Sequence, residues 1–367
     1  MGYGKVIKKY VRNFINDFRY NLESIKDQDE INYSKNIELQ SLTDSEIYDI
    51  NRKWAGVTPR LKNGYLGLRI YKTLHGFNPN YVPINYFYPF ITKSLNDSDA
   101  ITAFSHKGMM PIYFNGIRQP SIIINCIRGT LLDKEFHPIS LQSAIETIKN
   151  IHKDLIIKPS TDTSSGKNVR IIKLETNRKE LENIIRSYGN NFVIQEIINQ
   201  SEETKRFNPT SLQTLRINTL LLNNHLSVGR TIMRVGGANS IVDNLNAGGF
   251  MVDIKPNGQI SEYGYSLDGK KHSSSNGYIL KDYMIPNFDK VLNLAMEAHL
   301  RIPQCKLVGW DISLDEKNEP ILIEANLRNP SAVGVQLCGG PFFGSRTDEV
   351  IDFVRRNRDK RKIFSRI

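Results

Sequence analysis

Short apolar runs, each bounded by polar or turn-forming residues, recur along this chain and predict β-strands. Such runs occur within residues 104–129, including 111–116 and 121–124, and again at 155–157, 169–172 and 192–196. Two longer runs, 212–222 and 226–235, flank Asn223-Asn224 and predict a β-hairpin that turns at this pair. The chain beyond about residue 100 is therefore expected to build sheets.

Apolar residues at helical spacing predict helices between these strands. Ser140 is a favourable N-cap residue, and apolar positions follow it on one helical face. Further helices are expected over residues 178–188, ended by Gly189-Asn190, and over residues 288–298. Residues 1–95 also show helical periodicity, but they carry no motif that points to a chemistry.

Two apolar runs near the carboxyl end bring acidic residues together. Residues 310–314 and 321–330 are separated by a charged, turn-rich segment, so they predict a second hairpin. This hairpin places Asp311 beside Glu324 and Asn326, which lie two apart and share a face. Converging oxygen ligands suit Mg²⁺, especially when phosphates complete its shell. A surface hairpin with acidic strand ends is the alternative interpretation.

A loop of small residues follows another predicted strand. The run 155–157 ends in Lys158-Pro159, residues 160–167 are rich in serine, threonine and glycine, and the next strand follows. Backbone N–H groups in such a loop can bind anionic oxygens, and the charge of Lys158 beneath it suits a diphosphate. The order of a Walker loop and the dinucleotide fingerprint are both absent. An ordinary hairpin turn is the alternative to a phosphate site.

Together these motifs resemble the ATP-grasp fold. Lys158 at a strand end, the small-residue loop, the strand end Gln195-Glu196 and the final Asp311…Glu324-x-Asn326 set occur in the ATP-grasp order over about residues 100–345. The details are similar to the sugar-transfer-associated or teichuronic-type branch found in surface-polysaccharide gene clusters. The resemblance implies an α+β fold whose α+β subdomains grip ATP, with an additional, mostly helical region at residues 1–95. Within a domain at 96–345, it implies a nucleotide-covering part at about 140–200 and a catalytic part at about 201–345, followed by a basic C-terminal helix or tail at 346–367.

The resemblance also implies roles for individual residues. Lys158 matches the lysine that reaches the phosphates, and Lys107 resembles an earlier lysine, although Ser105-His106-Lys107-Gly108 departs from the usual Asp-Lys pair. The flexible loop over the phosphates matches Ser164, Ser165, Gly166 and Lys167, and the linker that binds adenine matches Gln195, Glu196, Ile197 and Ile198. The Mg²⁺ ligands match Asp311, Glu324 and Asn326, the ribose ligand is left open among Asn199, Glu202 and Glu203, and Arg328 is expected to contact the acid or a phosphate.

An arginine interrupts the apolar pattern of the first predicted hairpin. Alternation places Leu215 and Ile217 on one face and Arg216 on the other. A guanidinium among apolar strand residues is costly unless it meets an anion, so Arg216 is a candidate for the transferring phosphate. A surface arginine on an edge strand is the alternative. Arg230 and Arg234, four apart on the next strand, share a face with each other.

Composition and charge narrow the class of protein. A chain of 367 residues with 40% hydrophobic and 24% charged residues is ordinary for a soluble globular protein with more than one subdomain. No apolar stretch is long enough to span a membrane, no signal peptide is evident, and three separated cysteines suit a reducing cytoplasm. The net charge of +11 implies anionic partners, among which nucleotides, acidic sugars, nucleic acid and anionic lipid all qualify.

The expected activity is an ATP-dependent ligation of a carboxylate to an amine through an acyl phosphate. The expected partners are ATP, Mg²⁺, a carboxylate-bearing sugar or nucleotide-sugar and an amine, with no nucleic acid. Basic helices at residues 6–19 and 355–366 are expected to pack or be solvated, with contact to a membrane surface as the alternative. An ATP-dependent kinase and a non-enzymatic basic binding module for polysaccharide or nucleic acid are the alternative functions.

Overall fold

The computed structural model describes residues 38–57, 66–161, 168–237 and 248–364. The chain divides into two compact units, one made of Met1–Leu95, Tyr265–His272 and Ser331–Ile367, the other of Asn96–Gly264 and Ser273–Pro330. The predicted amphipathic helix at residues 6–19 and the loop residues 162–167 lie outside the described residues. Within the described ranges, no helix combines the length and the apolarity that crossing a membrane requires.

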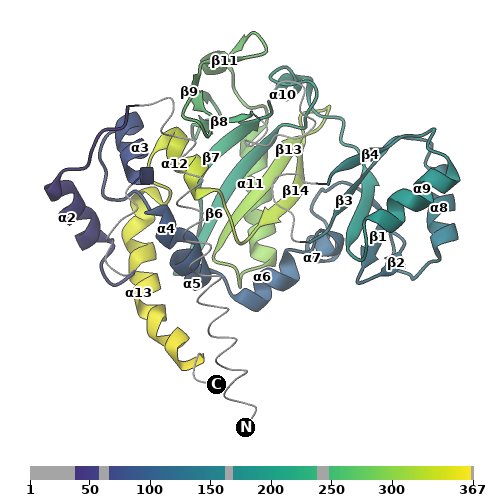
Figure 1. The fold of residues 1–367 in the computed structure, drawn as a ribbon, viewed down its shortest axis with the longest axis horizontal. Helices are drawn as coiled ribbons and strands as arrows, with labels where there is room; N and C mark the ends of the chain where they lie inside the picture. The colour runs from purple at the N-terminus through teal and green to yellow at the C-terminus, as the bar shows by residue number, and fades with distance from the viewer. Residues whose placement is uncertain (1–37, 58–65, 162–167, 238–247, 365–367) are drawn as a thin grey trace. The chain divides into compact units, whose positions relative to one another are not determined.

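The first unit is largely helical, as predicted for the N-terminal region (Figure 1). Its elements are α2 (Asp44–Lys53), α3 (Leu66–His75), α4 (Ile84–Tyr86), the π-helix η1 (Phe87–Thr92), α5 (Lys93–Leu95), β10 (Lys271–His272), α12 (Ala332–Gly339), the 3₁₀ turn η5 (Gly344–Arg346) and α13 (Thr347–Phe364). Thr43 and Glu46 form a reciprocal capping box at the start of α2. Phe87 packs edge-on against Phe342, with ring centroids 5.1 Å apart, and so joins segments distant in sequence.

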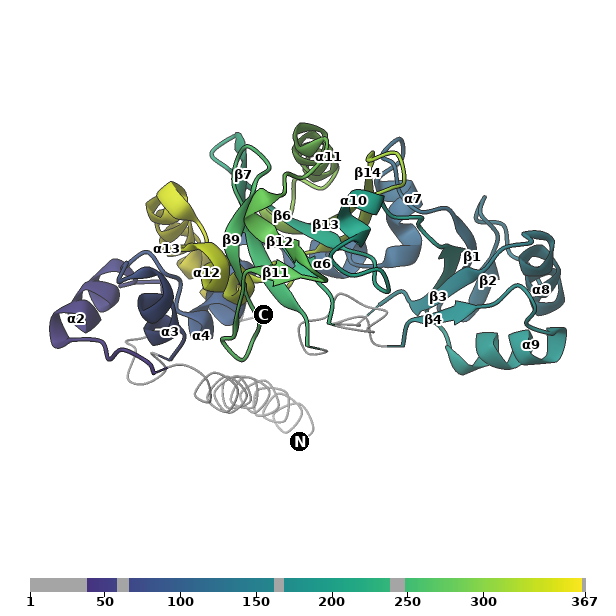
Figure 2. The same cartoon turned by 90° about the horizontal axis from the view of Figure 1, so that it is seen from above.

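A smaller antiparallel sheet lies in the second unit, between residues 122 and 196. Its strands are β1 (Ile122–Ile127), β2 (Thr130–Leu132), β3 (Leu155–Pro159), β4 (Arg170–Ile172) and β5 (Phe192–Glu196), in the order β2-β1-β5-β3-β4. Helices α8 (Leu141–Asn150), capped by Ser140 as predicted, and α9 (Arg178–Ser187) share an apolar core with these strands (Figure 2). The predicted strand–loop–strand therefore exists, with β3 paired to β4 around the loop.

A larger sheet completes the second unit. Its strands β6 (Thr214–Leu222), β7 (His225–Val235), β8 (Phe250–Ile254), β9 (Ile260–Tyr265), β13 (Leu307–Leu314) and β14 (Pro320–Asn326) follow the order β9-β8-β7-β6-β13-β14. Helix α11 (Phe288–Arg301) packs across β6, β7, β13 and β14, and its buried residues share a core with Leu215 and Ile217. Helix α11 covers one face of this sheet (Figure 1), and because side chains alternate along a strand, Arg216 lies on the face opposite to Leu215 and Ile217.

Several short elements also belong to the second unit. They are α6 (Ser98–Phe104), the 3₁₀ turn η2 (Lys107–Met109), α7 (Met110–Tyr113), α10 (Glu202–Lys205), the hairpin of β11 (Ser274–Ser275) and β12 (Tyr278–Ile279), and the 3₁₀ turn η4 (Leu280–Asp282). The strand predicted at residues 111–116 is wrong, since Pro111 stands in the first turn of α7. The fixed φ of proline suits that position, and Met110 and Phe114, four apart, are both buried.

Both predicted hairpins are confirmed. β6 and β7 turn at Asn223 and Asn224, whose φ values of +49° and +60° are the left-handed conformation that a tight turn requires. β13 and β14 pair in antiparallel fashion around the charged turn, with Asp311 opposite Glu324.

Candidate active site

Three charged residues lie side by side on adjacent strands of the larger sheet. Asp311 on β13 is paired with Glu324 on β14 and with Arg216 on β6, so all three project from the same face. Asn326, two residues beyond Glu324, joins this face and donates from Nδ2 to Asp311 Oδ2 at 3.2 Å. The predicted convergence of Asp311, Glu324 and Asn326 is therefore present.

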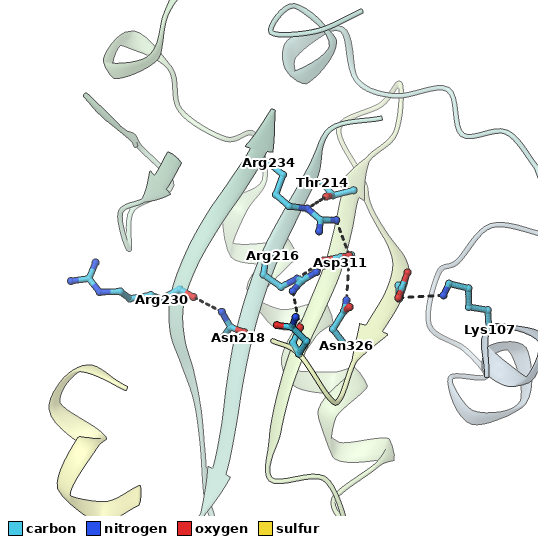
Figure 3. A network of polar contacts seen from close by, with 10 residues as sticks. Lys107, Thr214, Arg216, Asn218, Arg230, Arg234, Asp311 and Asn326 are labelled. Carbon is cyan, nitrogen blue, oxygen red and sulfur yellow. Dashed lines mark hydrogen bonds and ion pairs between the residues drawn. The ribbon is translucent and has the colours of Figure 1, made fainter. Parts of the chain in front are cut away.

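Asp311 is the centre of a buried polar network (Figure 3). Its Oδ1 accepts from Arg216 Nε at 2.5 Å, and its Oδ2 accepts from Arg216 Nη2 at 3.1 Å and Arg234 Nη2 at 2.9 Å. Asp311 is 4% exposed and Arg216 is 2% exposed. Burial by itself raises the pKa of Asp311, but the charges of Arg216 and Arg234 outweigh it and hold the pKa below its ordinary value.

Arg216 occupies a position that only a small neighbour permits. A side chain at Gly309, the β13 residue opposite Asn218 and therefore diagonal to Arg216, would bring Cβ within 3.1 Å of Arg216 Cδ and 2.9 Å of Pro330 Cα. Arg216 Nη1 also donates to the carbonyl of Asn329 at 3.3 Å. The anion that Arg216 meets in this structure is Asp311, and its contact with a transferring phosphate stays a prediction. The alternative interpretation as an edge-strand surface arginine is wrong, since β6 lies between β7 and β13.

The contact of Arg234 with Asp311 is the one that the sequence pattern did not predict. Arg234 stands opposite Thr214 in the β6–β7 pairing and donates from Nε to Thr214 Oγ1 at 3.0 Å. The sequence feature that indicates this position is the register of the hairpin that turns at Asn223-Asn224, because this register places Arg234 diagonally beside Arg216. Arg230 behaves differently: it pairs with Asp253 at 3.2 Å, and Figure 3 shows its side chain directed away from Asp311.

Two lysines from the neighbouring part of the same unit complete the charged group. Lys107 in η2 is 9% exposed, and its Nζ lies 3.3 Å from Glu324 Oε1. Lys158 stands near the end of β3. Burial, followed by the charge of Lys107, lowers the pKa of Lys158 to about 8 against the opposing effect of Glu324. Lys107, Lys158 and Glu324 therefore interact electrostatically, although they are far apart in sequence.

The remaining predicted residues are placed as follows. Gln195 and Glu196 end β5, where Gln195 is buried, and Ile197 beyond them is exposed. Ser164, Ser165, Gly166 and Lys167 lie outside the described residues. Arg328 is exposed and forms no ion pair within the described part of the chain. The ribose candidates Asn199, Glu202 and Glu203 bond to Glu316, Lys205 and Arg206 respectively.

The donor set suits a hard cation that is completed by a ligand. Asn326 donates from Nδ2 to Asp311, so its Oδ1 is not used in that bond, and Glu324 is only partly buried. Among residues with a described position, no cluster holds three or more His, Cys, Asp or Glu side chains in reach of one ion. Two carboxylates and one amide oxygen are fewer ligands than Mg²⁺ takes, so phosphate oxygens would be needed to complete its shell.

This fold, with its paired lysines and its acidic strand ends, defines a protein of the ATP-grasp class. The sequence matches the family described as sugar-transfer associated ATP-grasp over residues 91–351, and the chain belongs to that family. The predicted resemblance to the sugar-transfer-associated branch of the ATP-grasp proteins is confirmed.

Solved structures to which the chain is similar include several ligases. The D-alanine–D-alanine ligase from Coxiella burnetii is 8% identical, with 74% of this chain and 63% of that chain covered and a TM-score of 0.42. D-cycloserine synthetase DcsG is 10% identical, with 71% and 73% covered and a TM-score of 0.44. The ATP-grasp ligase PsnB, complexed with minimal precursor, Mg and ADP, is 13% identical, with 71% and 62% covered and a TM-score of 0.40. The chain thus spans less than two thirds of the first and third of these proteins, and a search of curated proteins found no match.

Proposed function

We propose that this protein is a cytoplasmic ATP-dependent carboxylate–amine ligase that forms an amide on a sugar acid or its nucleotide-linked form in surface-polysaccharide synthesis. The observation that carries the proposal is Asp311, which holds Arg216 and Arg234 on the sheet face that also bears Glu324. One carboxylate facing two guanidinium groups leaves net positive charge, which suits an anionic substrate. Membership of the sugar-transfer associated family supports the sugar, and the net charge of +11 supports an acidic one.

The chemistry follows from the weakness of carboxylates as electrophiles. A carboxylate oxygen of the acid attacks the γ-phosphorus of ATP, ADP departs, and an acyl phosphate forms. The amine nitrogen then attacks the carbonyl carbon, phosphate departs, and the nitrogen releases a proton. This route requires no covalent bond to the enzyme, so positioning and charge neutralisation are the tasks of the protein.

The charged residues divide these tasks between them. Lys107 and Lys158 would bind the nucleotide phosphates, because both lie beside Glu324 in a poorly solvated position. Arg216 and Arg234 would meet the developing charge on the transferring phosphoryl group, and exposed Arg328 would orient the acid by bidentate pairing. Asp311, Glu324 and Asn326 would hold Mg²⁺, which supplies further neutralisation of phosphate charge when bound.

Substrate-dependent product formation tests this function. Purified protein with Mg²⁺ and ATP should release ADP and phosphate only when both a sugar acid and an amine are present, with the amide detected by mass spectrometry. Glu324→Ala should abolish the turnover while the circular dichroism spectrum stays unchanged. Glu297→Ala, which removes an exposed carboxylate paired with Arg301 on α11, is the matched control and should keep full activity.

Other outcomes contradict the proposal in distinct ways. A phosphorylated sugar without amide would identify a kinase. Binding of polysaccharide or nucleic acid without ATP consumption would identify a binding module. Near-normal turnover by Glu324→Ala would refute the assignment of Glu324 to the metal and phosphate site. The excess positive charge also fits peripheral contact with an anionic membrane surface, which vesicles with and without anionic lipid would detect.

A further inference from the structure

The segment before Lys107 contains a histidine whose contacts reach beyond its own turn. His106 is the N-cap residue of η2, and its Nδ1 accepts the N–H of Gly108 at 3.1 Å. Nδ1 therefore carries a lone pair, so the proton of the neutral ring stands on Nε2. Nε2 lies 3.3 Å from Ser160 Oγ and can donate to it.

Ser160 is the point on which several bonds converge. It follows Lys158 by two residues and is fully buried. Its carbonyl accepts the N–H of Lys107 at 2.9 Å, and its own N–H donates to the carbonyl of Asn191 at 3.1 Å. Two bonds therefore connect the Lys107 turn to the end of β3: one between backbone groups, and one between the side chains of His106 and Ser160.

The two lysines need such a connection. The charge of Lys107 lowers the pKa of Lys158, so the two ammonium groups repel each other in the absence of a bound anion. Repulsion favours separation of the segments that carry them, whereas phosphate binding requires both at a fixed spacing. Glu324 compensates Lys107 at 3.3 Å, but it stands on β14 and does not join the two segments.

We propose that His106 is a positioning residue that fixes the Lys107 turn against Ser160 and thereby sets the spacing of Lys107 and Lys158 for the nucleotide phosphates. The inference rests on the proposed function, because it assigns both lysines to ATP. It also accounts for the departure of Ser105-His106-Lys107-Gly108 from an Asp-Lys pair. An aspartate side chain can accept the Gly108 N–H, but it is too short to act as the second, donating end that the imidazole supplies.

Two substitutions isolate the connection from the cap. In His106→Asn, the side-chain oxygen can still accept the Gly108 N–H, but the bond of the ring to Ser160 and its contact with the Asn191 side chain are lost. Ser160→Ala removes the same bond from its other end and keeps both backbone bonds of residue 160. His137→Asn, at an exposed histidine of the same unit, is the matched control.

The measurement is equilibrium binding of Mg²⁺ with a non-hydrolysable ATP analogue, without acid or amine. Each variant should weaken binding by about three- to tenfold, the effect of one lost hydrogen bond. The double variant should bind the analogue no more weakly than the single variant that has the lower affinity. The KM for the acid and the melting temperature should stay at the wild-type values. His137→Asn should bind like the wild type.

Wild-type affinity in both single variants, or effects that multiply in the double variant, would overturn the inference. An equal rise in the KM for the acid would also overturn it, since a general structural defect would then explain the loss. If His106→Asn does not fold, Ser160→Ala decides alone. If the wild-type protein makes no amide but nucleotide binding changes in the variants as described, the proposed ligase activity is refuted and the positioning role of His106 stands. If the wild-type protein binds no nucleotide, both proposals are refuted.

Discussion

Breaking the buried contact between Asp311 and Arg216 should cost more stability than any surface ion pair in this chain. In Asp311→Asn, Arg216 keeps its buried position but loses its carboxylate partner, and with 2% of its surface exposed it cannot recover hydration. Removal of one partner from a buried ion pair typically costs about 3–5 kcal/mol. Because Arg234 loses the same partner, we expect a value of about 4 kcal/mol.

Substitution of Arg216 should cost less free energy of unfolding than substitution of Asp311. In Arg216→Met, Asp311 still accepts from Arg234 at 2.9 Å and from Asn326 at 3.2 Å, so the carboxylate stays partly compensated. We expect a loss of about 2–3 kcal/mol, toward the lower part of the range for uncompensated buried charges. The double variant should lose less than the sum, with a coupling of about 1–3 kcal/mol, because neither charge is then left without the other.

Urea unfolding with linear extrapolation measures these free energies. The matched control is Arg301→Met, which breaks an exposed helical pair with Glu297 at 3.4 Å and should cost less than about 1 kcal/mol. A free energy of unfolding for Asp311→Asn within about 1 kcal/mol of the wild type would refute the buried network. Strict additivity of the two single variants would show that Asp311 and Arg216 do not interact.

Further predictions concern single positions. Because burial lowers the pKa of Lys158 to about 8, its amine loses charge above that pH in the free enzyme. The Kd for the ATP analogue should therefore rise about tenfold per pH unit above pH 8. Lys158→Arg, which keeps its charge, should flatten this rise. Gly309→Ala should destabilise the protein by about 1–3 kcal/mol in the same urea assay, because its Cβ would lie 2.9 Å from Pro330 Cα. Gly229→Ala is the control: the nearest atom to its Cβ lies at an ordinary 3.5 Å, so its loss of unfolding free energy should be smaller. Burial lowers the pKa of His299 to about 4, so the unfolded state binds more protons between about pH 4 and 6.5; the free energy of unfolding should fall with decreasing pH across that window by up to about 1.4 kcal/mol per unit, and comparison with His299→Gln should show that this slope is lost.

Local chemistry in the sequence determined the elements and the hairpin registers of this protein. Ser140 caps α8 because its hydroxyl accepts a backbone N–H three residues on, a contact that requires no distant partner. The asparagines at 223 and 224 turn β6 into β7, and strand alternation separates Arg216 from the core residues beside it. The same alternation, with one charged turn, places Asp311 opposite Glu324. The strand predicted at residues 111–116 is wrong because an apolar run of four residues fits a strand or a helical turn equally well.

Only the tertiary structure decided which charges meet. Arg216 bonds to Asp311 because β6 and β13 are neighbours in space although β7 to β12 lie between them in sequence, and no local pattern specifies that pairing. The lowered pKa of Lys158 likewise depends on burial and on the nearby charges of Lys107 and Glu324, which come from two other segments distant in sequence. Electrostatic interaction depends on distance and dielectric surroundings rather than on separation along the chain, so the residues were readable in the sequence but their partners were set by folding.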